Sequence, residues 1–142
     1  MRLTIELVPS SSWFSNVRSE VSKEEWDRIR KKCYQRANYR CEICGGKGPT
    51  HPVECHEEFH YDEYRGLQIL IRLIALCPAC HEVKHYGLAT VNGRAKEARE
   101  HLMKINNMSE VDAHCYLKGV AEEWQLRNKI DWILDLSYLD TY

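Results

Sequence analysis

The sequence predicts an α+β fold, and three observations support this class. Helix-capping signals occur at Ser22 and Ser109, each followed by apolar residues at helical spacing. Apolar and polar residues alternate near both ends of the chain, which is the period of a half-buried strand. Between these segments, two Cys-x-x-Cys pairs can staple a hairpin through a metal ion. With 142 residues, we expect residues 1–142 to form one domain.

The amino-terminal elements are predicted from local patterns. Residues 3–7 alternate and should form a short strand, which the following proline ends. Trp13 and Phe14 lie in a loop that either packs on the core, the reading we favour, or meets a base or a partner. Ser22 then caps a helix over about residues 22–39.

This helix and its exit present a basic surface that can face phosphates. Two tyrosines interleave with the basic residues, and no acidic residue occurs among them. The basic residues are Arg28, Arg30, Lys31, Lys32, Arg36 and Arg40. A solvated helix face is the alternative. Because the net charge of the chain is only −1, the argument for nucleic acid depends on this local clustering.

The central region is expected to form a hairpin followed by a helix. Residues 52–56 read as a short strand, 57–66 as an acidic aromatic loop, and 72–76 as a second strand. For residues 67–71, just before the second strand, the sequence pattern fits either a strand or a helix. A helix should begin at Pro78 and end with Gly87 in the C′ position.

The carboxy-terminal region, about residues 94–139, should contain two helices and a strand. Apolar residues at helical spacing mark the first helix over about 95–105. Ser109 with Asp112 caps the second helix. Alternation over 132–138 predicts a strand, and we expect it to pair with the amino-terminal strand in a small terminal sheet.

The two cysteine pairs, Cys41 with Cys44 and Cys77 with Cys80, predict a structural zinc ion. Four thiolates leave no open coordination position, so the site should stabilise the fold rather than catalyse. Buried or redox-active thiols are the alternative. An odd total of seven cysteines argues against a complete disulfide framework and favours a reducing, intracellular and cytoplasmic setting. No apolar stretch is long enough to predict membrane insertion.

Histidines near the second pair predict another metal site. His81 and His85 are four residues apart, so on a helix both imidazoles project from one side. His56 ends the first predicted hairpin strand and is a candidate for the same functional site. The alternative is that His56 has only a structural role in the hairpin. The remaining histidines, His51, His60, His101 and His114, are not expected to be metal ligands.

The pattern Cys-x-x-Cys, a strand ending in His56, and Leu-Cys-x-x-Cys-His-x-x-x-His resembles the zinc-stapled branch of the HNH endonuclease family, the ββα-metal nucleases. The resemblance covers about residues 41–87. It implies that His56 is a general base that activates water. It further implies that His81 and His85 hold a second divalent cation, Mg²⁺, Mn²⁺, Ni²⁺ or Zn²⁺, on the scissile phosphate. The expected activity is metal-dependent hydrolysis of DNA, with duplex DNA as partner.

Two positions depart from the family pattern. Cys55 stands where the family usually has an Asp or His ligand, so it is an additional candidate ligand that would favour zinc. Arg72 replaces the middle Asn and is a candidate phosphate clamp. Glu54, Glu57 and Asp62 are alternative oxygen ligands. These departures keep open a second function, a catalytically inactive zinc module that binds nucleic acid or a protein partner.

Overall fold

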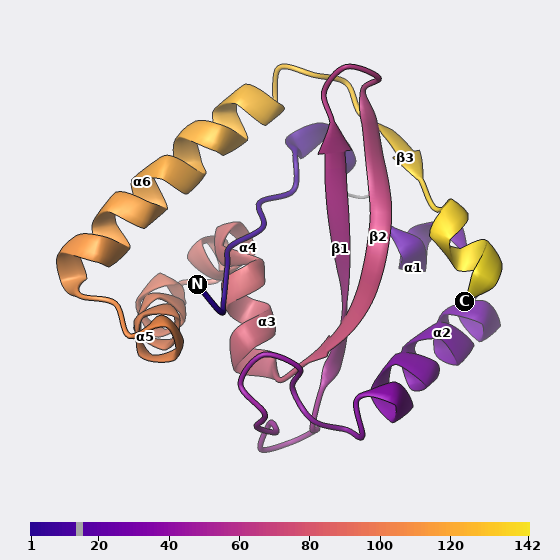
Figure 1. Cartoon of the computed structure of the whole chain (residues 1–142), viewed down its shortest axis with the longest axis horizontal. Helices are drawn as coiled ribbons and strands as arrows, with labels where there is room; N and C mark the ends of the chain where they lie inside the picture. Colours follow the sequence, from indigo (N-terminus) through magenta and orange to yellow (C-terminus); the bar gives the residue numbers. More distant parts are fainter. Residues whose placement is uncertain (14–15) are drawn as a thin grey trace.

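The computed structural model describes residues 1–13 and 16–142, and over this part the chain is a mixed α+β structure (Figure 1). The helices are α1 (Val17–Glu20), α2 (Lys23–Arg36), α3 (Pro78–Lys84), α4 (Tyr86–Val91), α5 (Ala95–Asn106) and α6 (Glu110–Arg127). The strands are β1 (Glu54–Asp62), β2 (Leu67–Leu76) and β3 (Ile133–Asp135), with short 3₁₀ turns at Ser10–Ser12 and Ser137–Thr141. None of the helices in the described ranges is long and apolar enough to cross a membrane.

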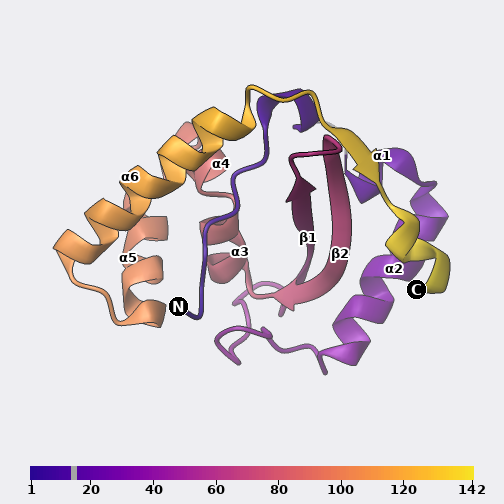
Figure 2. The ribbon, with the colours of Figure 1, turned by 45° about the horizontal axis from the view of Figure 1, so that its top comes forward.

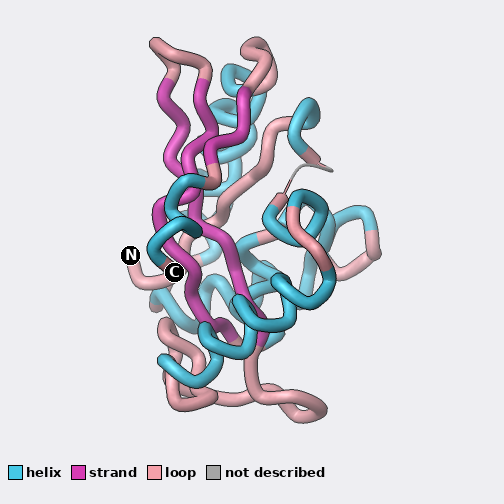
Figure 3. The backbone as a smooth tube through the Cα atoms, turned by 90° about the vertical axis from the view of Figure 1, so that its right-hand side faces the viewer, coloured by secondary structure: helices cyan, strands magenta, loops and turns pink. Residues whose placement is uncertain are grey.

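The β1–β2 hairpin lies at the centre of the molecule, between two groups of helices. Figures 1 and 2 both place α3, α4, α5 and α6 on one side of the hairpin and α1, α2 and β3 on the other. The strand order is β1-β2-β3, with β1 and β2 antiparallel. Seen from the side in Figure 3, the loops before β1 gather at the end of the hairpin opposite its tight turn. The hairpin thus connects the cysteine-rich loops to both helical layers.

Each face of the hairpin packs on its own hydrophobic cluster. One cluster includes Ile74 and Leu76 of β2 with buried residues of α3 and α5. The other includes Leu73 and Ala75 of β2 with Ile29 of α2 and other residues. Successive side chains of a strand point to opposite faces, which explains why alternate β2 residues join different clusters. Any two neighbouring residues of β1 therefore also face different helices.

Both strands of the hairpin are longer than the sequence suggested. The segment 57–66, predicted as a loop, continues β1 as far as Asp62, and the open stretch before residue 72 is part of β2. The register shifts between Glu58 and Phe59, which pair with Arg72 and Leu70. This β-bulge interrupts the simple alternation that would have identified a longer strand.

Two helix starts were predicted correctly from their caps. The Ser22 hydroxyl accepts the Glu25 N–H at 3.1 Å at the start of α2. Ser109 and Asp112 form a reciprocal capping box at the start of α6. The α2 helix ends at Arg36 rather than near residue 39, because Asn38 and Tyr39 adopt left-handed conformations with φ of 52° and 57°.

The prediction of an amino-terminal strand was wrong, because residues 3–7 do not join the sheet. Leu3 and Ile5 are buried as the alternation indicated. Their backbone groups bond instead to Asn106 of α5 and Tyr116 of α6. Side-chain acceptors thus satisfy the N–H groups that a strand would give to a neighbour.

The predicted carboxy-terminal strand exists over Ile133–Asp135, but its partner differs from the one expected. It pairs in parallel with β2, with Ile133 opposite Leu67. The Ile133 N–H donates to the Gly66 carbonyl at 2.8 Å, which docks the segment beside the hairpin turn. The edge of β2 was available because β1 occupies only its other side.

The helix that begins at Pro78 ends earlier than predicted. Helix α3 stops at Lys84, His85 is its last cap, and Gly87 lies inside α4 rather than in a C′ position. Local sequence did not show this bend at His85, whose ψ is 51°. In the amino-terminal loop Trp13 is 47 % exposed, and Phe14 lies outside the described residues.

Candidate functional site

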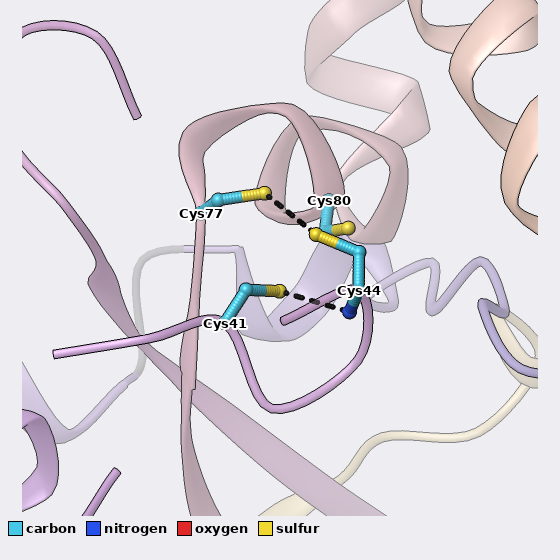
Figure 4. Close-up of side chains that lie close together, drawn as sticks. All are labelled: Cys41, Cys44, Cys77 and Cys80. Carbon is cyan, nitrogen blue, oxygen red and sulfur yellow. Dashed lines mark hydrogen bonds between the residues drawn. The ribbon is translucent and has the colours of Figure 1, made fainter. Parts of the chain in front are cut away.

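Four cysteine side chains converge beside the start of α3. Cys41 and Cys44 lie in the loop after α2, where the Gly45 N–H donates to the Cys41 carbonyl at 2.9 Å and Gly45 has a φ of 76°. Cys77 is the amino-terminal cap of α3 and Cys80 lies in its first turn. Figure 4 shows the four sulfurs directed toward one another. The two knuckles predicted from the sequence therefore meet in space.

The spacing of these sulfurs suits a tetrahedral zinc ion. All four lie within 4.8 Å of one another, and the Cys44 and Cys77 sulfurs are 3.7 Å apart. Zinc–sulfur bonds of about 2.3 Å at tetrahedral angles would place sulfurs about 3.8 Å apart. A disulfide needs a sulfur separation of about 2.05 Å. The cluster is compatible with a structural zinc site built from Cys41, Cys44, Cys77 and Cys80.

The electrostatics of the cluster also fit a dication. Thiols of Cys77 and Cys80 donate to Cys41 and lower the pKa of Cys41. The bond to Cys41 in turn raises the pKa of Cys77 to about 11. The protein alone therefore favours one thiolate over several. Ionising all four sulfurs requires a positive charge among them, which zinc supplies.

A fifth residue touches this cluster and was missed in the sequence. His101 of α5 places Nε2 3.2 Å from the Cys80 sulfur. His101 follows the buried Ala98 by three residues, so helical periodicity could have shown that it faces inward. Its contact with a cysteine that lies 21 residues earlier depends on how α5 packs on α3, which no local pattern shows.

Three histidines form a second group between β1 and α3. One ligand nitrogen from each of His56, His81 and His85 lies within 4.8 Å of the others. Their ring centroids are 4.8 to 5.2 Å apart, with interplanar angles of 68° to 73°. Imidazoles bound at about 2.1 Å around a tetrahedral ion would have centroids about 5 Å apart. The arrangement therefore fits a metal ion with an open fourth position.

Two of these rings each have one nitrogen bonded to a carboxylate. His81 Nδ1 is 2.8 Å from Glu54, and Glu54 is also 2.7 Å from His51. His56 Nε2 bonds to Glu6, a residue that sequence reasoning did not consider. Metal-binding histidines usually give their second N–H to a carboxylate or carbonyl in this manner.

The protonation states of the group suit cation binding. Burial lowers the pKa of His56, and burial with the neighbouring His81 lowers the pKa of His85 to about 3. Both rings are therefore neutral near pH 7, which is the form that binds metals. The hydrogen bond from His81 lowers the pKa of Glu54 to about 2, so this carboxylate is ionised.

The structure does not bring Cys55 or Arg72 into the histidine group. Cys55 is buried on the opposite face of β1, in the same cluster as Cys33 of α2, because it neighbours His56 on a strand. Arg72 makes a two-pronged ion pair with Glu58, at 2.9 and 3.1 Å. Its guanidinium is neutralised in this state rather than free for phosphate.

The other candidate oxygen ligands are also engaged elsewhere. Glu57 accepts the Val17 N–H at 2.6 Å, on the side of α1. Asp62 pairs with Arg65 near the hairpin turn at 2.6 Å. Of the three carboxylates proposed from the sequence, only Glu54 contacts one of the three histidines, and it binds the ring rather than completing the cluster.

Helix α2, which carries most of the predicted basic surface, lies across the hairpin from α3 (Figure 1). Two of its residues form ion pairs within α2, because Arg28 binds Glu25 and Arg30 binds Asp27. Lys32 and Arg36 both lie over the ring of Tyr142. Exposed positive charge remains at Lys31, Arg36 and Arg40. The basic patch and the histidine group are therefore separate features of the molecule.

Together, the fold and these two groups define a mixed α+β protein with a four-cysteine cluster able to bind zinc. Comparisons with known protein families, curated proteins and solved structures find no match to this chain.

Proposed function

We propose that the protein is a metal-dependent endonuclease that hydrolyses phosphodiester bonds of DNA, with a zinc-stapled ββα-metal site of the HNH type. The observation that supports this function best is the convergence of His56 from β1 with His81 of α3 and with His85 at the carboxy-terminal cap of that helix. The hairpin and helix that carry them are stapled at one end by the cysteine cluster. A strand histidine opposite two helix histidines is the arrangement that the sequence resemblance implies.

The three imidazoles would hold the divalent cation. Bound there, the cation would activate water and neutralise charge that develops on the phosphate. The protein contributes neutral rings, because burial disfavours their protonation. It also contributes the Glu54 carboxylate, which orients His81 through Nδ1 and leaves Nε2 as the ligand atom. Three protein ligands leave one position for water or substrate.

The surroundings of His56 support its assignment to the metal. Its side chain is 2 % exposed and its Nε2 is bonded to Glu6. A general base must reach a water molecule, and such burial restricts that access. The role of base, which the resemblance implies, is the alternative for this residue.

Alanine variants separate the two roles. His81→Ala should lose the second cation and cleavage of a supercoiled plasmid together. His56→Ala should do the same if it is a ligand, whereas a base would lose about 10²–10⁴-fold in rate with the cation retained. His114→Ala, at an exposed position of α6, is the matched control and should change neither. Equal cleavage by wild type and His81→Ala would remove the proposal.

The basic surface of α2 and its exit is the proposed DNA contact, and the salt dependence of binding tests it. Lys31→Ala and Arg40→Ala each remove an exposed positive charge. If each side chain neutralises a phosphate, the slope of log affinity against log salt should fall by about 0.9 for each variant. Lys118→Ala on α6 provides a charge-matched control. An unchanged slope in both variants would exclude α2 and its exit as the contact surface.

A non-catalytic zinc module that binds nucleic acid or a protein partner is the second candidate function. It is favoured by the acidic surroundings of the histidines, where Glu6 and Glu54 contact the rings and Glu58 pairs with Arg72. Carboxylates repel a phosphate, and the basic patch lies on the other side of the hairpin. Absence of cleavage with Mg²⁺, Mn²⁺, Ni²⁺ and Zn²⁺, together with retained DNA binding, would support this function instead.

A further inference from the structure

We propose that Glu6 is a positioning residue of the histidine site, and that the carboxy-terminal helices hold it there. Glu6 lies outside the hairpin and α3, in the extended amino-terminal segment, 50 residues before His56. Its carboxylate nevertheless bonds directly to His56 Nε2. This inference rests on the proposed cation site, and it identifies a residue that no pattern around the cysteines and histidines contains.

The segment that carries Glu6 is fixed by three separate elements. Asn106 of α5 accepts the N–H of Leu3 at 2.9 Å and donates to the Leu3 carbonyl at 2.7 Å. The Tyr116 hydroxyl of α6 accepts the Ile5 N–H at 2.9 Å. In both ribbon views the amino-terminal segment runs beside β1 in front of α3 (Figures 1 and 2). These bonds determine where the next residue, Glu6, can place its side chain.

Helix α3 supplies the third anchor of this segment and places an ammonium group beside Glu6. The Glu6 N–H donates to the Lys84 carbonyl at 3.0 Å, while the Lys84 ammonium contacts Glu6 at 3.3 Å and Thr4 at 2.8 Å. The Glu6 carboxylate therefore lies between the His56 ring on one oxygen and the Lys84 ammonium on the other. The Lys84 side chain is only 4 % exposed and that of Glu6 is 35 % exposed, so the ammonium is shielded from solvent while the carboxylate is partly open to it.

The bond from Glu6 fixes the tautomer of His56. A carboxylate only accepts hydrogen bonds, so the bonded Nε2 carries the proton and the lone pair of the ring stands on Nδ1. Nδ1 is buried and makes no hydrogen bond to any described residue. A buried imidazole nitrogen with a free lone pair is expected to bind a ligand, and a cation satisfies it.

The same device occurs once more in the site, which argues against an accidental contact. Glu54 binds Nδ1 of His81 and leaves the opposite nitrogen free. Glu54 is part of β1 and next to the helix, whereas Glu6 must be delivered by a distant segment. Loss of a carboxylate partner of this kind typically costs about 10–100-fold in metal affinity. The packing of α5 and α6 on the amino-terminal segment thus positions Glu6 next to His56.

The test measures binding of Co²⁺ to the zinc-loaded full chain by calorimetry, without DNA. Glu6→Gln keeps the size of the side chain but can donate as well as accept, so it no longer selects one tautomer. We expect about 10–100-fold weaker Co²⁺ binding and partial recovery in Glu6→Asp. The matched control is Glu58→Gln, which removes the same charge from β1 two residues beyond His56 and should have little effect.

Nitrogen-15 chemical shifts of the His56 ring in the metal-free chain provide a second readout. Wild type should show the Nε2–H tautomer alone, and Glu6→Gln a mixture. Equal Co²⁺ affinity in wild type and Glu6→Gln, or an equal loss in Glu58→Gln, would overturn the positioning role. The cation site itself would still be supported in that case if His81→Ala abolishes Co²⁺ binding. If wild type binds no Co²⁺, the cation site fails and the nitrogen shifts alone decide whether Glu6 sets the tautomer.

Tyr116→Phe keeps the inference testable if Glu6→Gln does not fold. This variant retains the carboxylate and removes only the hydroxyl that accepts the Ile5 N–H. We expect several-fold weaker Co²⁺ binding, because the segment is less fixed next to Glu6. Unchanged binding would show that the helices do not hold Glu6 in place.

Discussion

Replacement of Cys80 by serine is the most direct test of the zinc cluster. Three of its cysteines are at most 5 % exposed, and Cys80 is fully buried in the core that joins β2, α3 and α5. Such zinc sites contribute about 10–16 kcal/mol in small peptides. At about 0.05–0.15 kcal/mol per residue, a chain of this length has a total stability of about 7–21 kcal/mol. Loss of the site should therefore remove most of the stability.

We expect Cys80→Ser to lose its zinc and its cooperative thermal unfolding transition. Hydrogen exchange should lose protection first in α3 and α5, which pack around the cluster. Zinc content is measured by atomic absorption and unfolding by circular dichroism. Cys115→Ser is the matched control, because Cys115 is exposed on α6 and its loss should change stability by less than about 0.5 kcal/mol. A zinc-free wild type, or equal melting of both variants, would refute the structural role.

Three further predictions concern single residues. A methyl group at Gly48 would lie 2.6 Å from Cδ of Pro78, so Gly48→Ala should lower stability by about 1–3 kcal/mol in urea titrations. His101→Ala should weaken zinc retention against a chelator by about 10–100-fold, whereas unchanged release would show that its thiolate contact is incidental. Burial raises the pKa of the Glu57 carboxyl above its ordinary value of 4.5. The protonated carboxyl therefore contributes its full share of folding stability below pH 4.5, and this share is lost as the pH rises through the raised pKa. Glu57→Gln keeps an acceptor for the Val17 N–H and should flatten this decline, giving a higher urea midpoint at pH 7; a lower midpoint would contradict it.

Local signals in the sequence predicted most of the elements. Capping at Ser22 and Ser109 depends on residues within one helical turn, and both helix starts agree with the structure. Strand pairing failed as a prediction because residues 3–7 could be satisfied either by another strand or by side chains of α5 and α6. Alternation indicates which side chains are buried, but it carries no information about the partner that buries them.

The histidine group also shows the difference between what local sequence predicts and what long-range packing decides. His81 and His85 could be placed on one helix face from their spacing alone, and His56 from the family pattern. Cys55 could not be separated from His56 until the strand register placed them on opposite faces. Glu6 and His101 were beyond prediction, because each reaches its partner through the packing of a distant segment.

The sequence by itself therefore determined the types of the candidate metal ligands and their local spacing, since two Cys-x-x-Cys pairs and an i, i+4 histidine pair are patterns of short-range backbone geometry. Only the tertiary structure decided which residues surround these groups. The carboxylate that contacts His56, the imidazole that contacts Cys80, and the side of the hairpin that carries the basic helix all depend on long-range packing. Such contacts arise from burial of apolar faces, which is non-directional and does not encode a partner in local sequence.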